Sequence, residues 1–198
     1  MDGSDDQEGD LPTSAGLSSF NLLDERRLFA ALGLAPGMTM LDLGCGLGNY
    51  AVAASPRLGE SGVIHALDPW AEGIETLAAR AAMAGLANIR AVVADAGRPL
   101  PLESGRVDLC LLATVVHILA RQGIAARTLA EVCRVLKPGG RVAVVEFHKV
   151  AGPPGPPLEW RLAPADLARL LLAAGFRPVA CVEVGPCNYL SLFSQAGK

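Results

Sequence analysis

Short apolar runs and helix-like periods of apolar residues alternate along most of the chain. The runs at 39–43, 62–67, 89–94 and 107–113 predict strands, and the stretches 48–58, 71–84 and 123–136 predict helices. A further helix at 24–32, capped by Asp24 and ended by Gly33, precedes the first strand. Because a helix between consecutive strands lets them pair in parallel, this pattern predicts a doubly wound parallel sheet.

Pro56 conflicts with the helix predicted at 48–58. Deep inside a helix, proline removes the hydrogen bond to the carbonyl of Val52 and favours a kink. We therefore expect this helix to bend or to end early.

The remaining part of the chain breaks the alternation. A LysProGlyGly turn at 137–140 leads into a strand at 141–147. The run PPGPP at 153–157 excludes regular helix or ladder and predicts a loop or a stiff extended connector. A helix at 164–174 precedes two strands, 179–184 and 189–194, whose tight connection at 185–188 predicts a hairpin. The predicted fold is α/β: a doubly wound, mostly parallel seven-stranded sheet that ends in an antiparallel hairpin.

The composition is typical of one compact domain. The 198 residues are 51% apolar, enough for a single core, which we expect to span residues 17–198. Residues 1–10 hold five acidic residues and no basic one, so the segment 1–16 is expected to be a disordered acidic leader. Beyond residue 10, 15 acidic and 17 basic residues nearly balance, which gives no electrostatic reason to expect a nucleic-acid partner.

The sequence predicts neither membrane insertion nor export. The longest mostly apolar run, 109–120, is shorter than the ~20 residues that a bilayer span needs, and Met1 precedes acidic and small polar residues. Five cysteines, an odd number without a CxxC pair, indicate neither a disulfide framework nor a metal site. We therefore expect a cytoplasmic protein without bound metal, for which a homo-oligomer stays open.

The segment 40–48, MLDLGCGLG, carries the candidate chemistry. A buried strand turns here into a helix through Gly44, Gly46 and Gly48, and glycine lets a ligand approach the backbone closely because it has no Cβ. Asp42 stands two residues before the first of these glycines. A carboxylate there repels a pyrophosphate but attracts an α-amino group, so the charge pattern favours an amino-acid ligand over a dinucleotide.

Two further carboxylates end the next two predicted strands. Asp68 closes the second strand, where a carboxylate accepts hydrogen bonds from both ribose hydroxyls at the topological switch point. Asp95 follows the third strand, within reach of an exocyclic adenine amine. Each aspartate alone is commonly a turn or helix cap. Three acids that end three consecutive strands after one glycine loop favour a nucleoside-type ligand.

These residues resemble the class I S-adenosylmethionine-dependent methyltransferases, from about residue 20 to the C-terminus. The resemblance implies an enzyme that transfers a methyl group from S-adenosylmethionine to a small-molecule acceptor by aligned in-line displacement. It also implies a sheet whose closing hairpin inserts its last strand. GluPheHisLys at 146–149 and the LysProGlyGly turn look like the ubiquinone and menaquinone biosynthesis C-methyltransferases.

The same resemblance implies which residues bind the cofactor. These are Asp42, Gly44, Cys45 and Gly46 for the methionine end, Asp68 for the ribose, Pro69 and Trp70 near the ring, and Asp95 and Ala96 for the adenine. Tyr50, at the start of the following helix, either contacts the cofactor or packs beneath it.

The acceptor side has weaker candidates. His117 lies just beyond the fourth strand, where the sulfonium is expected to point, and is either the catalytic base or a packed residue at a helix start. His148, next to Glu146, is a second candidate for which a structural role is favoured, and Arg161 and Trp160 are candidates for an acceptor pocket. Two other functions stay open: an NAD-type dinucleotide-dependent oxidoreductase, and a regulatory module that binds S-adenosylmethionine without turnover.

Overall fold

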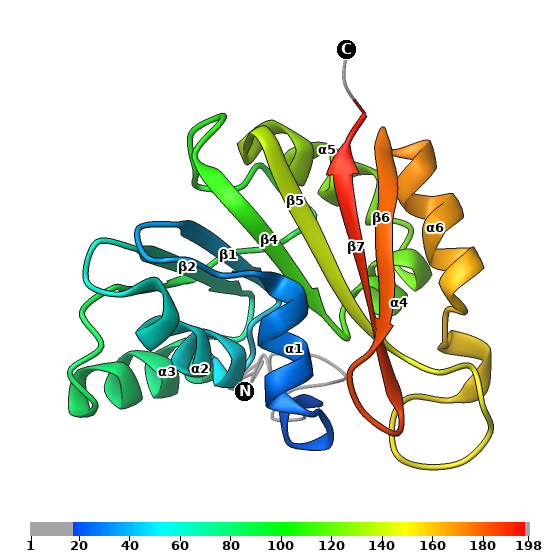
Figure 1. The fold of residues 1–198 in the computed structure, drawn as a ribbon, viewed down its shortest axis with the longest axis horizontal. Coiled ribbons are helices and arrows are strands. Elements are labelled where there is room, and N and C mark those ends of the chain that lie inside the picture. Colours follow the sequence, from blue (N-terminus) through cyan, green and yellow to red (C-terminus); the bar gives the residue numbers. More distant parts are fainter. Residues whose placement is uncertain (1–17, 197–198) are drawn as a thin grey trace, which may run out of the picture.

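A seven-stranded sheet forms the centre of the molecule, with the strand order β3-β2-β1-β4-β5-β7-β6 (Figure 1). The computed structural model describes residues 18–196, and the leader expected at 1–16 lies outside the described residues. The strands are β1 (Thr39–Leu43), β2 (Val63–Asp68), β3 (Ile89–Val93), β4 (Val107–Ala113), β5 (Leu136–Phe147), β6 (Phe176–Glu183) and β7 (Asn188–Gln195).

Five strands pair in parallel, and the hairpin closes the sheet in the opposite direction. β1 pairs with β2 and β4, β2 with β3, and β4 with β5, all in parallel, whereas β7 runs antiparallel to both β5 and β6. The last strand is thus inserted between β5 and β6. This confirms the predicted mostly parallel α/β sheet with its antiparallel hairpin.

Helices cover both faces of the sheet and create two hydrophobic cores. One core lies against α1 (Glu25–Leu32), α2 (Asn49–Leu58) and α3 (Ala71–Met83), and the other against α4 (Val116–Arg121), α5 (Ala125–Val135) and α6 (Pro164–Ala173). Because side chains alternate along a strand, Met40 of β1 enters the first core, and Leu41 and Leu43 enter the second. Within residues 18–196 no helix is both long and apolar enough to cross a membrane.

The helix α4 is a feature that the sequence analysis did not predict. The structure has two helices between β4 and β5, separated by a turn at Gly123 (φ +69°), whereas the pattern predicted one helix at 123–136. α4 is short, and its N-cap residue, Val115, makes no side-chain capping hydrogen bond. Its apolar residues directly continue the buried run of β4, so periodicity does not separate them.

The prediction that Pro56 ends its helix early is wrong, because α2 continues to Leu58. Pro56 lies in the last turn, so its missing N–H removes one hydrogen bond, to the Val52 carbonyl, close to the point where the helix ends. Asn88 also satisfies this end of the helix: its Nδ2 donates to the carbonyls of Ser55 and Gly59 at 3.1 and 2.9 Å.

The LysProGlyGly segment is a bulge within β5 and does not precede the strand as a separate turn. Leu136 pairs with Val107 and Arg141 with Leu109, so residues 137–140 bulge out of the ladder between them. Lys137 Nζ lies 2.7 Å from Asp108 Oδ2 on β4. This ion pair ties the bulge to the neighbouring strand.

Candidate functional site

A cavity of about 650 Å³ opens at the carboxyl edge of the parallel strands. It lies where β1 and β4 lead to helices on opposite faces, the switch point at which doubly wound sheets bind ligands. Two segments cover it, one around Ser19 and Leu22 and the other the proline loop at 154–157. Among the residues predicted from the sequence, the wall includes Gly44, Gly46, Asp68, Pro69, Trp70, Asp95, Ala96 and His117.

Asp68 connects the glycine loop to the end of β2. Its Oδ2 accepts a hydrogen bond from the Gly46 N–H at 2.8 Å, and its Oδ1 accepts one from the Trp70 N–H at 2.9 Å. Each carboxylate oxygen can accept a further bond. Asp68 therefore shapes the loop and still presents acceptors to hydroxyl groups in the cavity.

Gly44 and Gly46 are needed for different reasons. A Cβ at Gly44 (φ +79°) would lie 2.8 Å from Cγ2 of Val115, so glycine allows the loop to approach the segment after β4. Apart from its chain neighbours, a Cβ at Gly46 (φ +52°) would meet no atom of residues 18–196 within 4 Å. Since Gly46 lies on the cavity wall, the loop leaves room for a ligand directly against its backbone.

Asp42 lies beneath the loop and does not reach the cavity wall. The residue is 1% exposed, and neither carboxylate oxygen has a hydrogen-bond partner in residues 18–196. Burial, followed by the negative charge of Asp68, raises the pKa of Asp42 from its usual 3.8 to about 7. A buried carboxylate without a donor is costly, so a cationic ligand nearby would relieve this arrangement.

The raised pKa of Asp42 predicts that the ligand-free chain becomes less stable as the pH rises from about 4 to about 7. In that interval the unfolded chain releases the proton while the folded chain retains it, so the free energy of unfolding falls by about 4 kcal/mol. Asp42→Asn, which cannot ionise, is expected to lack this loss. Urea unfolding of both proteins at several pH values measures the difference. A pH dependence identical in the two proteins would contradict the prediction.

The wall at the end of β3 combines an acid with an aromatic ring. Asp95 Oδ1 accepts a hydrogen bond from the Gly97 N–H at 2.7 Å, and the Ala96 carbonyl accepts one from Thr128 Oγ1 at 2.8 Å. The Trp70 ring borders the same cavity, and its Nε1 is buried without a hydrogen-bond partner in the described part of the chain. This region offers a carboxylate acceptor beside an aromatic surface.

Tyr50 and Cys45 lie behind the wall and do not line the cavity. The Tyr50 hydroxyl is 2.7 Å from Ser19 Oγ, and its ring packs edge-on against Phe20 with 5.1 Å between centroids. Ser19 itself lines the cavity and lies 3.4 Å from Thr114 Oγ1. Of the two roles open for Tyr50, its position corresponds to packing, where it supports the segment that covers the site.

His117 reaches the cavity from α4, and a buried glutamate of β5 holds it. Glu146 Oε1 accepts a hydrogen bond from the His117 N–H at 3.1 Å, and Glu146 Oε2 lies 2.8 Å from His117 Nδ1. The His148 ring pairs with a different acid, because its Nε2 lies 2.7 Å from Oε2 of Glu183. In the sequence Glu146 stands close to His148, and nothing local indicates that α4 packs against β5 and brings His117 to Glu146.

Arg161 does not line the acceptor side, contrary to the expectation from the sequence. It is 6% exposed, and its guanidinium donates five hydrogen bonds to backbone carbonyls of the preceding loop. The acceptors are the carbonyls of Pro156, His148, Val150, Gly152 and Pro154, at 2.6–3.3 Å. Trp160 does line the cavity, with the Arg121 guanidinium 4.1 Å from its ring centroid. Arg161 thus holds the proline loop that covers the site.

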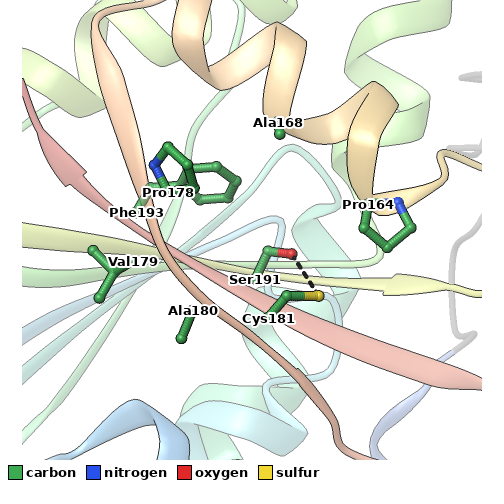
Figure 2. A pocket seen from close by; sticks show the side chains of 8 residues that line it. All are labelled: Pro164, Ala168, Pro178, Val179, Ala180, Cys181, Ser191 and Phe193. Carbon is green, nitrogen blue, oxygen red and sulfur yellow. Dashed lines mark hydrogen bonds between the residues drawn. The ribbon is translucent and has the colours of Figure 1, made fainter.

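A smaller hollow of about 210 Å³ lies between α6 and the hairpin strands β6 and β7 (Figure 2). Figure 2 shows its polar pair, Ser191 and Cys181, bonded to each other, with 3.4 Å between Oγ and Sγ. The remaining side chains around it are apolar. None of its residues lies at the edge where the parallel strands end, so we assign the candidate site to the larger cavity.

The chain is similar to known methyltransferases in sequence and in structure. A family model described as a methyltransferase domain matches residues 40–140, about half of the chain. The chain is 36% identical over 125 residues to the ubiquinone/menaquinone biosynthesis C-methyltransferase UbiE of Bordetella parapertussis, covering 63% of this chain and 46% of that one. It is 34% identical over 121 residues to the 2-phytyl-1,4-naphtoquinone methyltransferase of Trichormus variabilis, with coverages of 59% and 50%.

A solved structure extends the similarity over most of the chain. The SAM-dependent methyltransferase of Aquifex aeolicus superposes with a TM-score of 0.82 and 29% identity, covering 90% of this chain and 93% of that one. The chain spans about half the length of the curated relatives it matches. Together, the matched domain, the UbiE-like relatives and the shared fold show that this chain belongs to the methyltransferase-domain family of class I enzymes, whose cofactor is S-adenosylmethionine.

Proposed function

We propose that this chain transfers a methyl group from S-adenosylmethionine to a small-molecule acceptor by aligned in-line displacement. The observation that carries the proposal is the cavity at the switch point, which Gly46, Asp68, Asp95 and His117 all line. The dinucleotide alternative has less support. Its expected sheet continues in parallel, whereas β7 here is antiparallel and inserted.

The described residues suit S-adenosylmethionine. Asp42 is a buried carboxylate without a partner, which suits the cationic methionine end, and Gly46 leaves open space at the loop. Asp68 retains acceptor capacity for the ribose hydroxyls. We assign Gly44 and Gly46 to the methionine end with Asp42, Asp68 to the ribose, Pro69 and Trp70 to the ring surroundings, and Asp95 and Ala96 to the adenine.

The cofactor supplies a methyl group that is already activated, so the protein has to align the acceptor and exclude water. The position of the proline loop and of the segment around Ser19 suits both tasks, because both segments line the cavity. We further propose that residues 17–198 form a single domain for this purpose.

We propose a mostly apolar, ring-bearing acceptor. Leu22, Ile118, Phe147 and Trp160 give the acceptor side of the cavity an apolar and aromatic surface, which suits a flat ring. By their names, the curated relatives act in ubiquinone and menaquinone biosynthesis and on 2-phytyl-1,4-naphtoquinone. That chemistry is compatible with such a cavity.

Formation of S-adenosylhomocysteine tests this function. The assay supplies S-adenosylmethionine and a series of hydroquinones and phenols with increasingly large apolar substituents, beside amino acids and short oligonucleotides. We expect product with the apolar ring compounds, increasing with apolar substitution. Product only with the amino acids or oligonucleotides would overturn the proposed acceptor class.

A further inference from the structure

The contact between His117 and Glu146 fixes which ring nitrogen of the histidine is free. Glu146 is fully buried, and both of its oxygens are used: Oε1 by the His117 backbone N–H and Oε2 by Nδ1. An ionised carboxylate only accepts hydrogen bonds, so Nδ1 must carry the hydrogen. In a neutral ring the other nitrogen, Nε2, is then the free acceptor, and it has no hydrogen-bond partner in residues 18–196.

The surroundings of Glu146 add no other cation. In the described part of the chain its carboxylate forms an ion pair only with His117. The neighbouring Asn188 donates from Nδ2 to the Glu146 backbone carbonyl at 3.3 Å and not to the carboxylate. A proton that arrives at Nε2 would create an imidazolium held against a buried, otherwise unpaired carboxylate. This arrangement has the geometry of a catalytic histidine oriented by an acid.

A purely structural role for His117 would need only one of its two hydrogen bonds to Glu146. The bond from the His117 N–H to Oε1 caps the start of α4, and one acceptor oxygen is sufficient for that. The second bond, to Nδ1, orients a ring that lines the cavity. A fixed orientation of the His117 ring is useful only if the free Nε2 atom takes part in binding or catalysis.

We propose that His117 is a general base held by Glu146 as a positioning residue, and that the acceptor is therefore a molecule whose methylated atom carries a proton, such as a hydroxyl oxygen or an acidic carbon. The proton moves from that atom to Nε2 of His117. The electron pair left behind forms the bond to the methyl carbon, and the pair of the broken carbon–sulfur bond stays on sulfur. Acceptors methylated at a tertiary amine or thioether need no base and are excluded from the class. This inference rests on the proposed function.

The tautomer of His117 tests the positioning role without cofactor or acceptor. In the full chain labelled with ¹⁵N-histidine, two-bond ¹H–¹⁵N correlation spectra distinguish Nδ1–H from Nε2–H, and His117→Gln identifies the His117 signals. We expect the Nδ1–H form in the native chain. In Glu146→Gln the single amide oxygen must face the backbone N–H, so the amide NH₂ faces Nδ1, and the ring should switch to Nε2–H. His65 and His148 are internal controls whose signals should not change.

An Nε2–H tautomer in the native chain would overturn the proposal, whether or not Glu146→Gln folds. If S-adenosylmethionine fails to bind while the tautomer is as expected, the proposed function fails and the histidine geometry stands. Turnover tests the acceptor class: His117→Gln should lower transfer to a phenol or hydroquinone by about 100-fold or more, the usual contribution of a general base. Unchanged transfer to a phenol or hydroquinone by a folded His117→Gln protein would contradict the assignment.

Discussion

Asp68→Ala is expected to lower the affinity for S-adenosylmethionine by about 100-fold. The side chain holds the Gly46 and Trp70 amides and, in our assignment, accepts the ribose hydroxyls, so its removal disorders the loop and deletes cofactor contacts. A charge-assisted hydrogen bond contributes about 1.5–3 kcal/mol, and about 2.8 kcal/mol corresponds to the expected factor. Isothermal titration calorimetry measures the affinity directly.

Asp95→Ala is the matched control for this substitution. Asp95 also follows a strand at the same sheet edge, but it has a single backbone bond, to Gly97, and its side chain is half exposed. We expect a loss of about tenfold or less, because exposed polar contacts contribute about 1 kcal/mol. Unchanged affinity in a folded Asp68→Ala protein would remove Asp68 from the cofactor site.

Arg161→Ala is expected to destabilise the chain by about 3 kcal/mol and to open the proline loop. Five carbonyls lose their shared donor, and hydrogen bonds to a charged group contribute about 1.5–3 kcal/mol each without being additive. Urea unfolding and limited proteolysis at residues 150–157 measure the two effects. The rate of methyl transfer should decrease when the proline loop opens. The affinity for S-adenosylmethionine should change little, because Arg161 does not touch the wall assigned to the cofactor.

Two substitutions control for the loss of positive charge alone. Arg169→Ala removes an arginine whose side chain is 75% exposed and which pairs with Asp166 on the surface, so less than about 1 kcal/mol should be lost. Arg161→Lys keeps the charge but has three donor hydrogens in place of five, and it should be intermediate. If Arg161→Ala is as stable as Arg169→Ala, the loop does not depend on the buried guanidinium.

Features with local signals could be predicted from the sequence. Asp24 caps α1 through the Arg27 N–H, and Gly33 ends that helix in the left-handed conformation, as the residue types indicate. Strand periodicity likewise predicts the carboxyl edge of the sheet, and it places Asp68 and Asp95 at that one edge. Both line the same cavity.

Features that depend on packing between distant segments could not be predicted. His117 and Glu146 are 29 residues apart, and their contact exists because α4 starts beside the end of β5. Arg161 appeared as a candidate pocket residue, since nothing in the sequence indicates that the loop carbonyls converge on its guanidinium. Asp42 was expected to contact the ligand directly, but only the structure reveals that it lies beneath the loop and off the cavity wall.

Calorimetric titration of the full chain with S-adenosylmethionine, S-adenosylhomocysteine and NAD tests the central claim most directly. The cavity with Asp68 and Asp95 on its wall and Asp42 beneath the glycine loop predicts binding of the two sulfur nucleosides and no measurable binding of NAD. Binding of NAD alone would contradict the account.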